Sequence, residues 1–343
     1  MVDRAAHIAA FLDAAGWGAA TRIPLSGDAS FRRYERLVGG PRPALLMDAP
    51  PPREDVRAYG VVARHLVALG YSAPRLYAED APAGLLVIED FGDETYTRRL
   101  AAGHAEEDLY ALAVDLLIDL HRRENALGPD PARPVVPPYD DDALLEEAAL
   151  LTDWYLPAMA GHPTEESVRE SYLALWRGLL PAARAIPRSL VLRDYHVDNL
   201  MWLAGRSGVA RCGLLDFQDA RAGPVAYDLV SLLEDARRDI EPALATAMRR
   251  RYLDAFPDID RDAFDAAYAI LGAQRNCKII GIFTRLCRRD DKPGYVVHIP
   301  RVWRLLEGDL DHPALAPLAR WLDTHAAARG VPPMAQLAEG RGS

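Results

Sequence analysis

The stretch Ser189-Leu-Val-Leu-Arg-Asp-Tyr-His-Val-Asp-Asn-Leu-Met-Trp202, followed by Cys212-Gly-Leu-Leu-Asp-Phe-Gln-Asp219, decides the fold. It predicts a short apolar strand that ends in a polar loop, and then a hairpin whose second strand leads to Asp216. The loop carries Asp194 and, five positions later, Asn199. A simpler alternative is a polar hairpin with incidental acids, because Asp and Asn are common in turns.

The spacing of these three side chains is typical of protein-kinase-like folds, in which an Asp that accepts a hydroxyl proton converges with two metal ligands. The loop from Arg193 to Asn199 and the segment Asp216-Phe-Gln218 resemble the catalytic loop and metal segment of the aminoglycoside phosphotransferase/choline kinase family. The resemblance implies that Asp194 is catalytic and that Asn199 and Asp216 bind metal. Leu192 and Arg193 depart from the family's His and Gly.

The same resemblance implies the fold class and the domains. We expect an α+β, protein-kinase-like two-lobed fold with a small β-rich N-lobe and a larger, mainly helical C-lobe. The N-lobe, residues 1–92, would hold the nucleotide-binding sheet and the hinge. The C-lobe, residues 93–343, would hold the catalytic loop, the metal site and the helices for the acceptor.

Composition narrows the class of protein. The chain has 343 residues, 50% of them apolar, and a net charge of -10, which argues against a protein that binds nucleic acid. Its three cysteines have neither disulfide nor metal-ligand spacing, and no secretion signal or membrane-length apolar run is present. We therefore expect a cytoplasmic protein, with no membrane partner, that is a monomer.

The first predicted hairpin carries small residues at its tip. Ser26, Gly27, Asp28, Ala29 and Ser30 would let backbone N–H groups and two hydroxyls approach the phosphates of a nucleotide. By themselves these residues are more typical of a plain turn. The downstream Asp194 loop favours the nucleotide interpretation.

The third predicted strand, residues 44–50, has Met47 where kinase-like folds usually supply a phosphate-binding lysine. One hypothesis is that an arginine replaces the lysine, and Arg33 is the first candidate. The other hypothesis is a nucleotide-binding module that no longer transfers phosphate. Glu54 or Asp55 could anchor such a basic group, although acids in a first helical turn are also favoured by the helix dipole.

An apolar run, Gly84 to Gly92, ends in Glu89-Asp-Phe91. It resembles the family's strand that leads into the hinge, whose backbone receives the adenine, so Glu89 and Phe91 are candidate nucleotide-binding residues. Helical periodicity predicts further helices over residues 3–16, 54–69, within 93–123, over 140–156, over 165–186 with a break at Pro181, and through most of 241–328.

Several residues of the helical part are candidates for binding the acceptor. Asp153-Trp-Tyr155 could stack on a sugar and bind its hydroxyls, or could be a core aromatic cluster. Arg275 and Lys278 could reach the acceptor, or could belong to a surface-facing basic stripe, and His196 is a further candidate. Asp228 resembles the family's helix carboxylate that braces the catalytic loop through backbone N–H groups.

The acceptor is suggested only by a closer resemblance. Residues 27–34, 46–51, 192–202, 216–220 and 298–303 are similar to the anomeric N-acetylmuramate/N-acetylglucosamine kinases of bacterial cell-wall recycling. The resemblance implies ATP and Mg²⁺ as cofactors, an amino sugar as acceptor, and a sugar 1-phosphate as product for UDP-sugar synthesis. In that family Met47 would be normal. An antibiotic-modifying aminoglycoside phosphotransferase and a pseudokinase remain as alternatives.

Overall fold

The structure is a computed structural model that describes residues 4–25, 32–126 and 136–338. Its chain forms two compact units. The first contains the residues up to Val136 together with 197–220, and the second contains 137–196 together with the residues from Arg221 onward. The chain thus returns to the first unit after His196, inside the predicted catalytic loop. The boundary predicted at residue 92 separates two lobes, which are not the same division as these two compact units. That boundary stays a prediction.

The first unit is built on a five-stranded antiparallel sheet with the order β1-β2-β3-β5-β4. Its strands are β1 (Thr21–Pro24), β2 (Arg33–Val38), β3 (Ala44–Asp48), β4 (Leu76–Asp80) and β5 (Leu85–Glu89). Its helices are α1 (Arg4–Ala14), α2 (Val56–Ala68), α3 (Tyr96–Ala101) and α4 (Glu106–Ala126). The predicted helices and strands of this part are therefore confirmed, with small shifts at their ends.

Both faces of the central strands are buried. Leu46 and Val87 pack in one cluster with Ile8 and Leu12 of α1. Because side chains alternate along a strand, Met47 lies on the opposite face from Leu46, and it is fully buried. Strand β3 therefore presents no cation at this position, and Met47 is a core residue.

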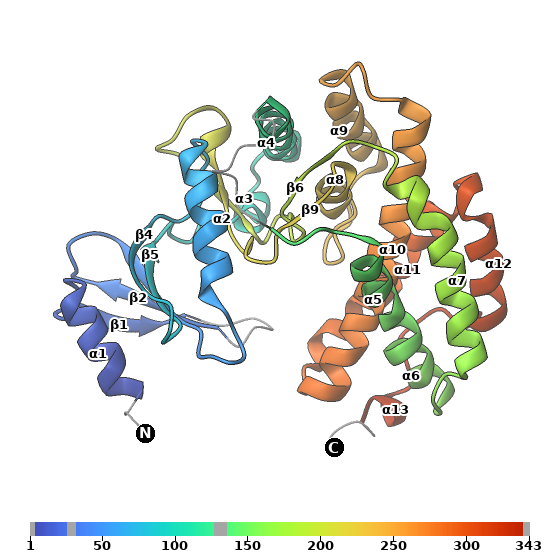
Figure 1. Ribbon diagram of the computed structural model, residues 1–343, viewed down its shortest axis with the longest axis horizontal. Coiled ribbons are helices and arrows are strands. Elements are labelled where there is room, and N and C mark those ends of the chain that lie inside the picture. The colour runs from blue at the N-terminus through green and yellow to red at the C-terminus, as the bar shows by residue number, and fades with distance from the viewer. Residues whose placement is uncertain (1–3, 26–31, 127–135, 339–343) are drawn as a thin grey trace. The chain divides into compact units, whose positions relative to one another are not determined.

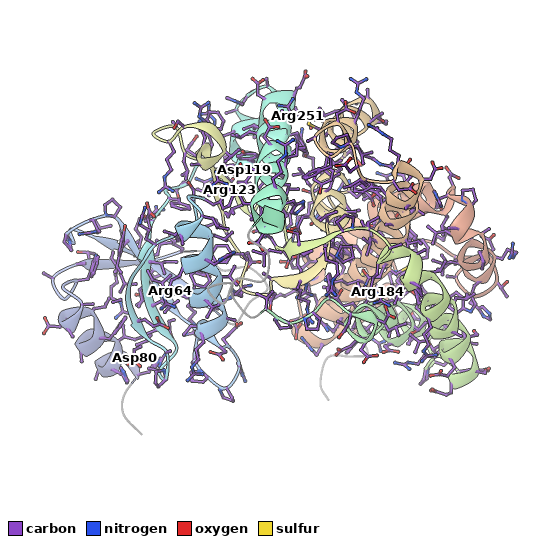
Figure 2. All side chains as sticks on the ribbon, turned by 45° about the horizontal axis from the view of Figure 1, so that its top comes forward. Arg64, Asp80, Asp119, Arg123, Arg184 and Arg251 are labelled. Carbon is purple, nitrogen blue, oxygen red and sulfur yellow. The ribbon has the colours of Figure 1, made fainter. Side chains whose placement is uncertain are left out.

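Helix α4 belongs to the first unit, and polar contacts join it to α2 and to the residues just after α2. Asp119 and Arg123, labelled in Figure 2, form an ion pair of 2.7 Å one turn apart on α4. Asp119 Oδ2 also accepts a hydrogen bond from the Tyr71 hydroxyl, 2.7 Å away. A second contact joins the same two helices, because His65 Nε2 of α2 lies 2.7 Å from Glu124 Oε1 of α4.

A short hairpin completes the first unit. Strands β7 (Leu200–Trp202) and β8 (Cys212–Leu214) pair with Leu200 opposite Leu214. The Tyr59 ring of α2 stacks on Phe217, with ring centroids 4.9 Å apart. The strand pairing fixes the register of the hairpin, and the contact between Tyr59 and Phe217 holds the hairpin against α2. The residues on either side of the hairpin are positioned by these two contacts.

The second unit is mainly helical. Its helices are α5 (Asp141–Leu150), α6 (Leu156–Ala160), α7 (Glu166–Ala183), α8 (Ala226–Leu233), α9 (Pro242–Asp254), α10 (Arg261–Asp290), α11 (Ile299–Leu310), α12 (Ala316–His325) and α13 (Met334–Ala338). A π-helical turn, Leu151–Tyr155, joins α5 to α6, and β6 (Arg188–Val191) pairs with β9 (Arg221–Pro224). The predicted break at Pro181 is wrong, because α7 continues through it to Ala183.

Helix α10, drawn in orange in Figure 1, contacts α5, α7, α8 and α11. Two glycines permit the closest approaches. A Cβ on Gly281 would lie 2.3 Å from the Leu150 carbonyl oxygen, and one on Gly272 would lie 2.4 Å from Asp309 Oδ1. In the described part of the chain, no helix combines the length and the apolar character that crossing a bilayer requires.

Candidate active site

Asn199 and Asp216 lie at the same end of the β7–β8 hairpin, in the first unit. The Leu215 N–H donates to the Asn199 carbonyl oxygen over 3.0 Å, one residue beyond the paired Leu200 and Leu214. Both side chains are half-buried. An amide oxygen and a carboxylate are hard oxygen ligands that suit Mg²⁺, which usually takes one or two protein ligands and completes its shell with phosphates and water. Among the described residues, no group of three or more His, Cys, Asp or Glu side chains is arranged to hold a metal ion.

Backbone strain coincides with the predicted catalytic and metal residues. Within the described ranges, three residues other than glycine have positive φ: Arg193 (71°), Asp216 (57°) and Asp291 (51°). Asp291 ends α10, where a left-handed residue is common. The other two adjoin or supply a proposed reacting group, and such conformations, which cost about 1–3 kcal/mol, tend to cluster at functional sites.

The whole of the predicted phosphate-binding segment, Ser26 to Ser30, lies outside the described residues. Arg33 is exposed at the start of β2 and pairs in register with Asp48. Its neighbour Arg32 is the arginine that lies beside Asp216, with Nη2 3.0 Å from Oδ1. Arg32 Nε also lies 3.8 Å from Glu54 Oε2, whereas Asp55 caps α2 by accepting from the Arg57 N–H. The two acids before α2 thus have different partners: Glu54 lies near Arg32, whereas Asp55 caps α2 and pairs with Arg57 of the same helix, with Nη1 3.4 Å from Oδ1.

Glu89 and Phe91 lie at the end of β5, as the sequence predicts for a hinge. Glu89 Oε1 forms an ion pair of 2.5 Å with Arg206 Nη2, and the same guanidinium lies over the Phe91 ring, 4.9 Å from its centroid. Arg36 holds the following turn through Asp90 at 2.6 Å and Asp93 at 3.0 Å. The side chains of Glu89 and Phe91 are therefore engaged within the first unit. Their proposed relation to adenine stays a prediction.

In the second unit, Asp228 of α8 supports the backbone that leads into Asp194. Its Oδ2 and Oδ1 accept hydrogen bonds from the backbone N–H groups of Leu192 (2.6 Å) and Arg193 (2.8 Å). Burial raises the pKa of Asp228 to about 7, although these two backbone hydrogen bonds act in the opposite direction. Asp228 therefore fixes the left-handed turn at Arg193 through both of its carboxylate oxygens.

The Asp194 side chain lies among cationic groups of the second unit. Burial acts to raise its pKa, but nearby basic side chains outweigh burial and hold the pKa below its usual range. These basic side chains are Lys278, His196, Arg193 and Arg275. Asp194 is therefore ionised at neutral pH and able to accept a hydrogen bond. For His196, burial is the largest effect and lowers the pKa.

Glu147 of α5, which the sequence analysis missed, is the centre of this charged cluster. Its Oε1 lies 3.1 Å from Lys278 Nζ and also receives Arg193 Nη2. Its Oε2 accepts from the Tyr139 hydroxyl. Burial acts to raise the pKa of Glu147, and the positive charges of Lys278 and Arg193 lower it further than burial raises it. A sequence signal existed, since Glu147 follows the buried Leu144 by one helical turn and so falls on the apolar face of α5.

Arg275 and Lys278 are buried on α10, so the surface-stripe alternative is wrong. Arg275 Nη1 donates to the Glu234 carbonyl oxygen over 3.1 Å. Lys278 Nζ lies 3.4 Å from the Tyr227 hydroxyl. Both cations therefore face the interior of the second unit, with Asp194 among the charges that they influence.

The Asp153-Trp154-Tyr155 segment forms part of the π-helical turn. Tyr155 is fully buried, packs against Trp303 at 5.5 Å between ring centroids, and donates to the Gly330 carbonyl oxygen over 3.0 Å. Tyr155 is therefore a core aromatic, and its prediction as a sugar-stacking residue is wrong. Asp153 forms an ion pair of 2.8 Å with Arg169, and Trp154 is half-buried.

These features define a phosphotransferase of the kinase-like fold, and comparison with known proteins agrees. Residues 21–265 match the phosphotransferase enzyme family, APH, and the chain belongs to that family. Among solved structures, the GDP complex of an aminoglycoside 2'-phosphotransferase-IIIa mutant is similar, with a TM-score of 0.60 at 15% identity, covering 89% of this chain and 96% of that one.

Two curated relatives have a more specific name. The N-acetylmuramate/N-acetylglucosamine kinase of Caulobacter vibrioides is 38% identical and matches 94% of this chain and 97% of its own length. The protein of that name from Pseudomonas aeruginosa is 40% identical, with 86% of each chain covered. The predicted family, the kinase-like fold and the phosphotransferase activity are thereby confirmed.

Proposed function

We propose that this phosphotransferase is an ATP-dependent amino-sugar kinase that acts on the anomeric C1 hydroxyl of N-acetylmuramate and N-acetylglucosamine. The observation that carries the proposal is the near full-length similarity to kinases named for these two sugars. The products would be ADP and a sugar 1-phosphate, a precursor suited to peptidoglycan recycling and UDP-sugar synthesis.

Asp194 is the proposed acceptor of the hydroxyl proton. As the sugar oxygen forms its bond to the γ-phosphorus, the bond from that phosphorus to the bridging oxygen of ADP breaks, and the proton passes to Asp194. A depressed pKa makes Asp194 a weak base but a reliable hydrogen-bond acceptor. This suits a loose transition state, in which the proton leaves late and alignment matters more than basicity.

Asn199 and Asp216 are the proposed ligands of Mg²⁺, which when bound would neutralise charge on the phosphates. Asp194 and Asn199 are only five residues apart, so one loop supplies both the proton acceptor and a metal ligand. The left-handed backbone at Asp216 and its hydrogen bond from Gln218 Nε2, 3.1 Å, restrict the carboxylate to a defined direction.

Lys278, Arg275 and His196 are the proposed acceptor-side residues. Lys278 and Arg275 contribute positive charge near Asp194, whereas burial lowers the pKa of His196 and keeps its imidazole neutral at neutral pH. Positive charge favours an acceptor that is neutral or anionic, such as N-acetylmuramate with its carboxylate, over a polycationic aminoglycoside. This electrostatic argument favours the sugar kinase over the antibiotic-modifying alternative.

The test is a screen of acceptors with purified protein, ATP and Mg²⁺, followed through ADP production. We expect turnover with N-acetylmuramate and N-acetylglucosamine and at most trace turnover with aminoglycosides. Preferred turnover of an aminoglycoside would refute the amino-sugar assignment. ATP binding without ADP production on any acceptor would favour the pseudokinase.

A further inference from the structure

Arg32 has an unusual position for an arginine at the start of a strand. Its side chain is only 11% exposed, and it lies between two carboxylates, Asp216 at 3.0 Å and Glu54 at 3.8 Å. Burial acts to lower its pKa, but Tyr34 and the nearby carboxylates outweigh burial and raise the pKa, so the guanidinium is charged. All of these groups belong to the first unit.

The neighbours of Arg32 indicate what it would bind. Asp216 is a proposed ligand of the metal that accompanies the phosphates, so a guanidinium 3.0 Å from Asp216 is within reach of the same anions. Guanidinium groups bind phosphate through paired N–H donors, and they keep their charge when partly buried. Glu54 provides an anchor at the start of α2 that would hold the guanidinium in place as phosphate approaches.

Composition narrows the choice of cation. The chain has only two lysines, Lys278 and Lys292, and both belong to the second unit. A basic residue of the first unit that binds phosphate must therefore be an arginine or a histidine. Met47 is excluded because it is fully buried in the sheet, and Arg33 is exposed beside Asp48 in register.

We propose that Arg32 binds the β- and γ-phosphates of ATP in this chain, with Glu54 as its positioning residue. The proposal rests on the nucleotide-binding part of the proposed function and is independent of the acceptor. The proposal assigns phosphate binding to Arg32 instead of Arg33, because Arg32 is less exposed and lies beside two carboxylates.

The test compares Arg32→Ala with Arg33→Ala in the full-length protein, using titration calorimetry with ATP and, separately, with adenosine. We expect Arg32→Ala to weaken ATP binding about 10- to 100-fold, the size of a lost charge-assisted contact. Arg33→Ala should change ATP binding by less than about threefold, as for an exposed charge. Adenosine, which has no phosphates, should bind both variants as it binds the wild type.

Two results would overturn the proposal: equal effects of the two substitutions on ATP, or weakening of adenosine binding by Arg32→Ala to the same extent as ATP binding. The second result would mean that Arg32 only maintains the shape of the first unit. Arg32→Lys is a further check in case alanine prevents folding, and it should restore part of the ATP affinity because it keeps the charge but loses the paired donors. If the wild type binds ATP but phosphorylates no sugar, the acceptor assignment fails while this test still decides the role of Arg32.

Discussion

The two units use charge in different ways. In the first unit, the arginine–carboxylate pairs Arg32–Asp216 and Arg36–Asp90 lie beside the predicted metal and hinge residues, with carboxylate exposure of 38% and 8%. In the second unit, the half-buried Asp194 lies near Lys278, which is 9% exposed and pairs with Glu147, and the buried Asp228 is bonded to the loop backbone.

This difference indicates that the charged groups of the two units have different functions. Asp216 is the most exposed of these side chains, at 38%, so it can exchange its arginine partner for a metal ion at low cost. Buried charged groups are costly to disturb and keep one arrangement, which suits a group that must stay ionised and aligned. The comparison predicts that substitutions in the second unit will change catalysis or stability more than comparable substitutions in the first.

The largest effect is expected for Asp194→Asn. An amide cannot take the proton, so kcat should fall by about 10²- to 10⁴-fold, while ATP affinity in calorimetry should stay within about twofold of the wild type. Asp198→Asn is the matched control, because Asp198 belongs to the same loop but bonds to the Thr97 hydroxyl. Retention of more than a few per cent of activity by Asp194→Asn would show that its role is wrong.

Glu147→Gln should produce the largest loss of stability. The substitution leaves Lys278 and Arg193 without their shared carboxylate, and removal of one member of a buried ion pair typically costs about 3–5 kcal/mol. The free energy of unfolding from denaturant titration measures this. Glu146→Gln, at the exposed neighbouring position, should change it by less than about 0.5 kcal/mol. Similar small effects of both changes would remove the central role given to Glu147.

Gly281→Ala should reduce stability by about 1–3 kcal/mol, since the new Cβ would meet the Leu150 backbone at 2.3 Å and force α10 away from α5. Gly178→Ala on α7 is the control, because its Cβ would meet nothing within 4 Å. It should instead stabilise the protein by about 0.5–1 kcal/mol. Thermal melts of the two variants that shift in the same direction would contradict this account of the α5–α10 contact.

The smallest expected effect is a change in how stability depends on pH. Asn276 Nδ2 donates to Glu234 and to Asp309, each over 2.9 Å. Burial raises the pKa of Glu234 from 4.5 to about 7, and burial and the Glu234 charge raise that of Asp309. Tyr268, Arg249 and Arg275 also face this pair.

Between pH 4.5 and about 7 the folded protein therefore binds more protons than the unfolded chain at these groups, so their contribution to stability falls as pH rises. The side chain introduced by Asp309→Asn is uncharged at every pH, so the stability of the variant should decline less as pH rises. The unfolding free energy of the variant minus that of the wild type should therefore increase from pH 5 to pH 8. Asp228 adds a similar decline to both proteins and cancels in the difference. Parallel curves of unfolding free energy against pH would contradict the assignment.

The sequence predicted what a contiguous motif can specify. Asp194, Asn199 and Asp216 stand at strand ends within one short stretch, and the strand pattern itself indicates where they lie in their units. Glu147 and Lys278 come from helices remote in sequence, so their meeting depends on packing that local patterns do not determine. Arg32 and Arg33 are neighbours at a strand end, where successive side chains point to opposite faces of the sheet. An error of one residue in the predicted register therefore selects the wrong arginine. Tyr155 was misjudged for a related reason, since an aromatic suited to stacking is equally suited to a core.

The most direct test of the account is phosphorus NMR of the wild-type product formed from N-acetylglucosamine, ATP and Mg²⁺. We predict a single new phosphate ester whose phosphorus couples to the anomeric proton, together with loss of the reducing end of the sugar. A phosphorus signal coupled to the protons at C6, or no new ester with either N-acetylglucosamine or N-acetylmuramate, would contradict it.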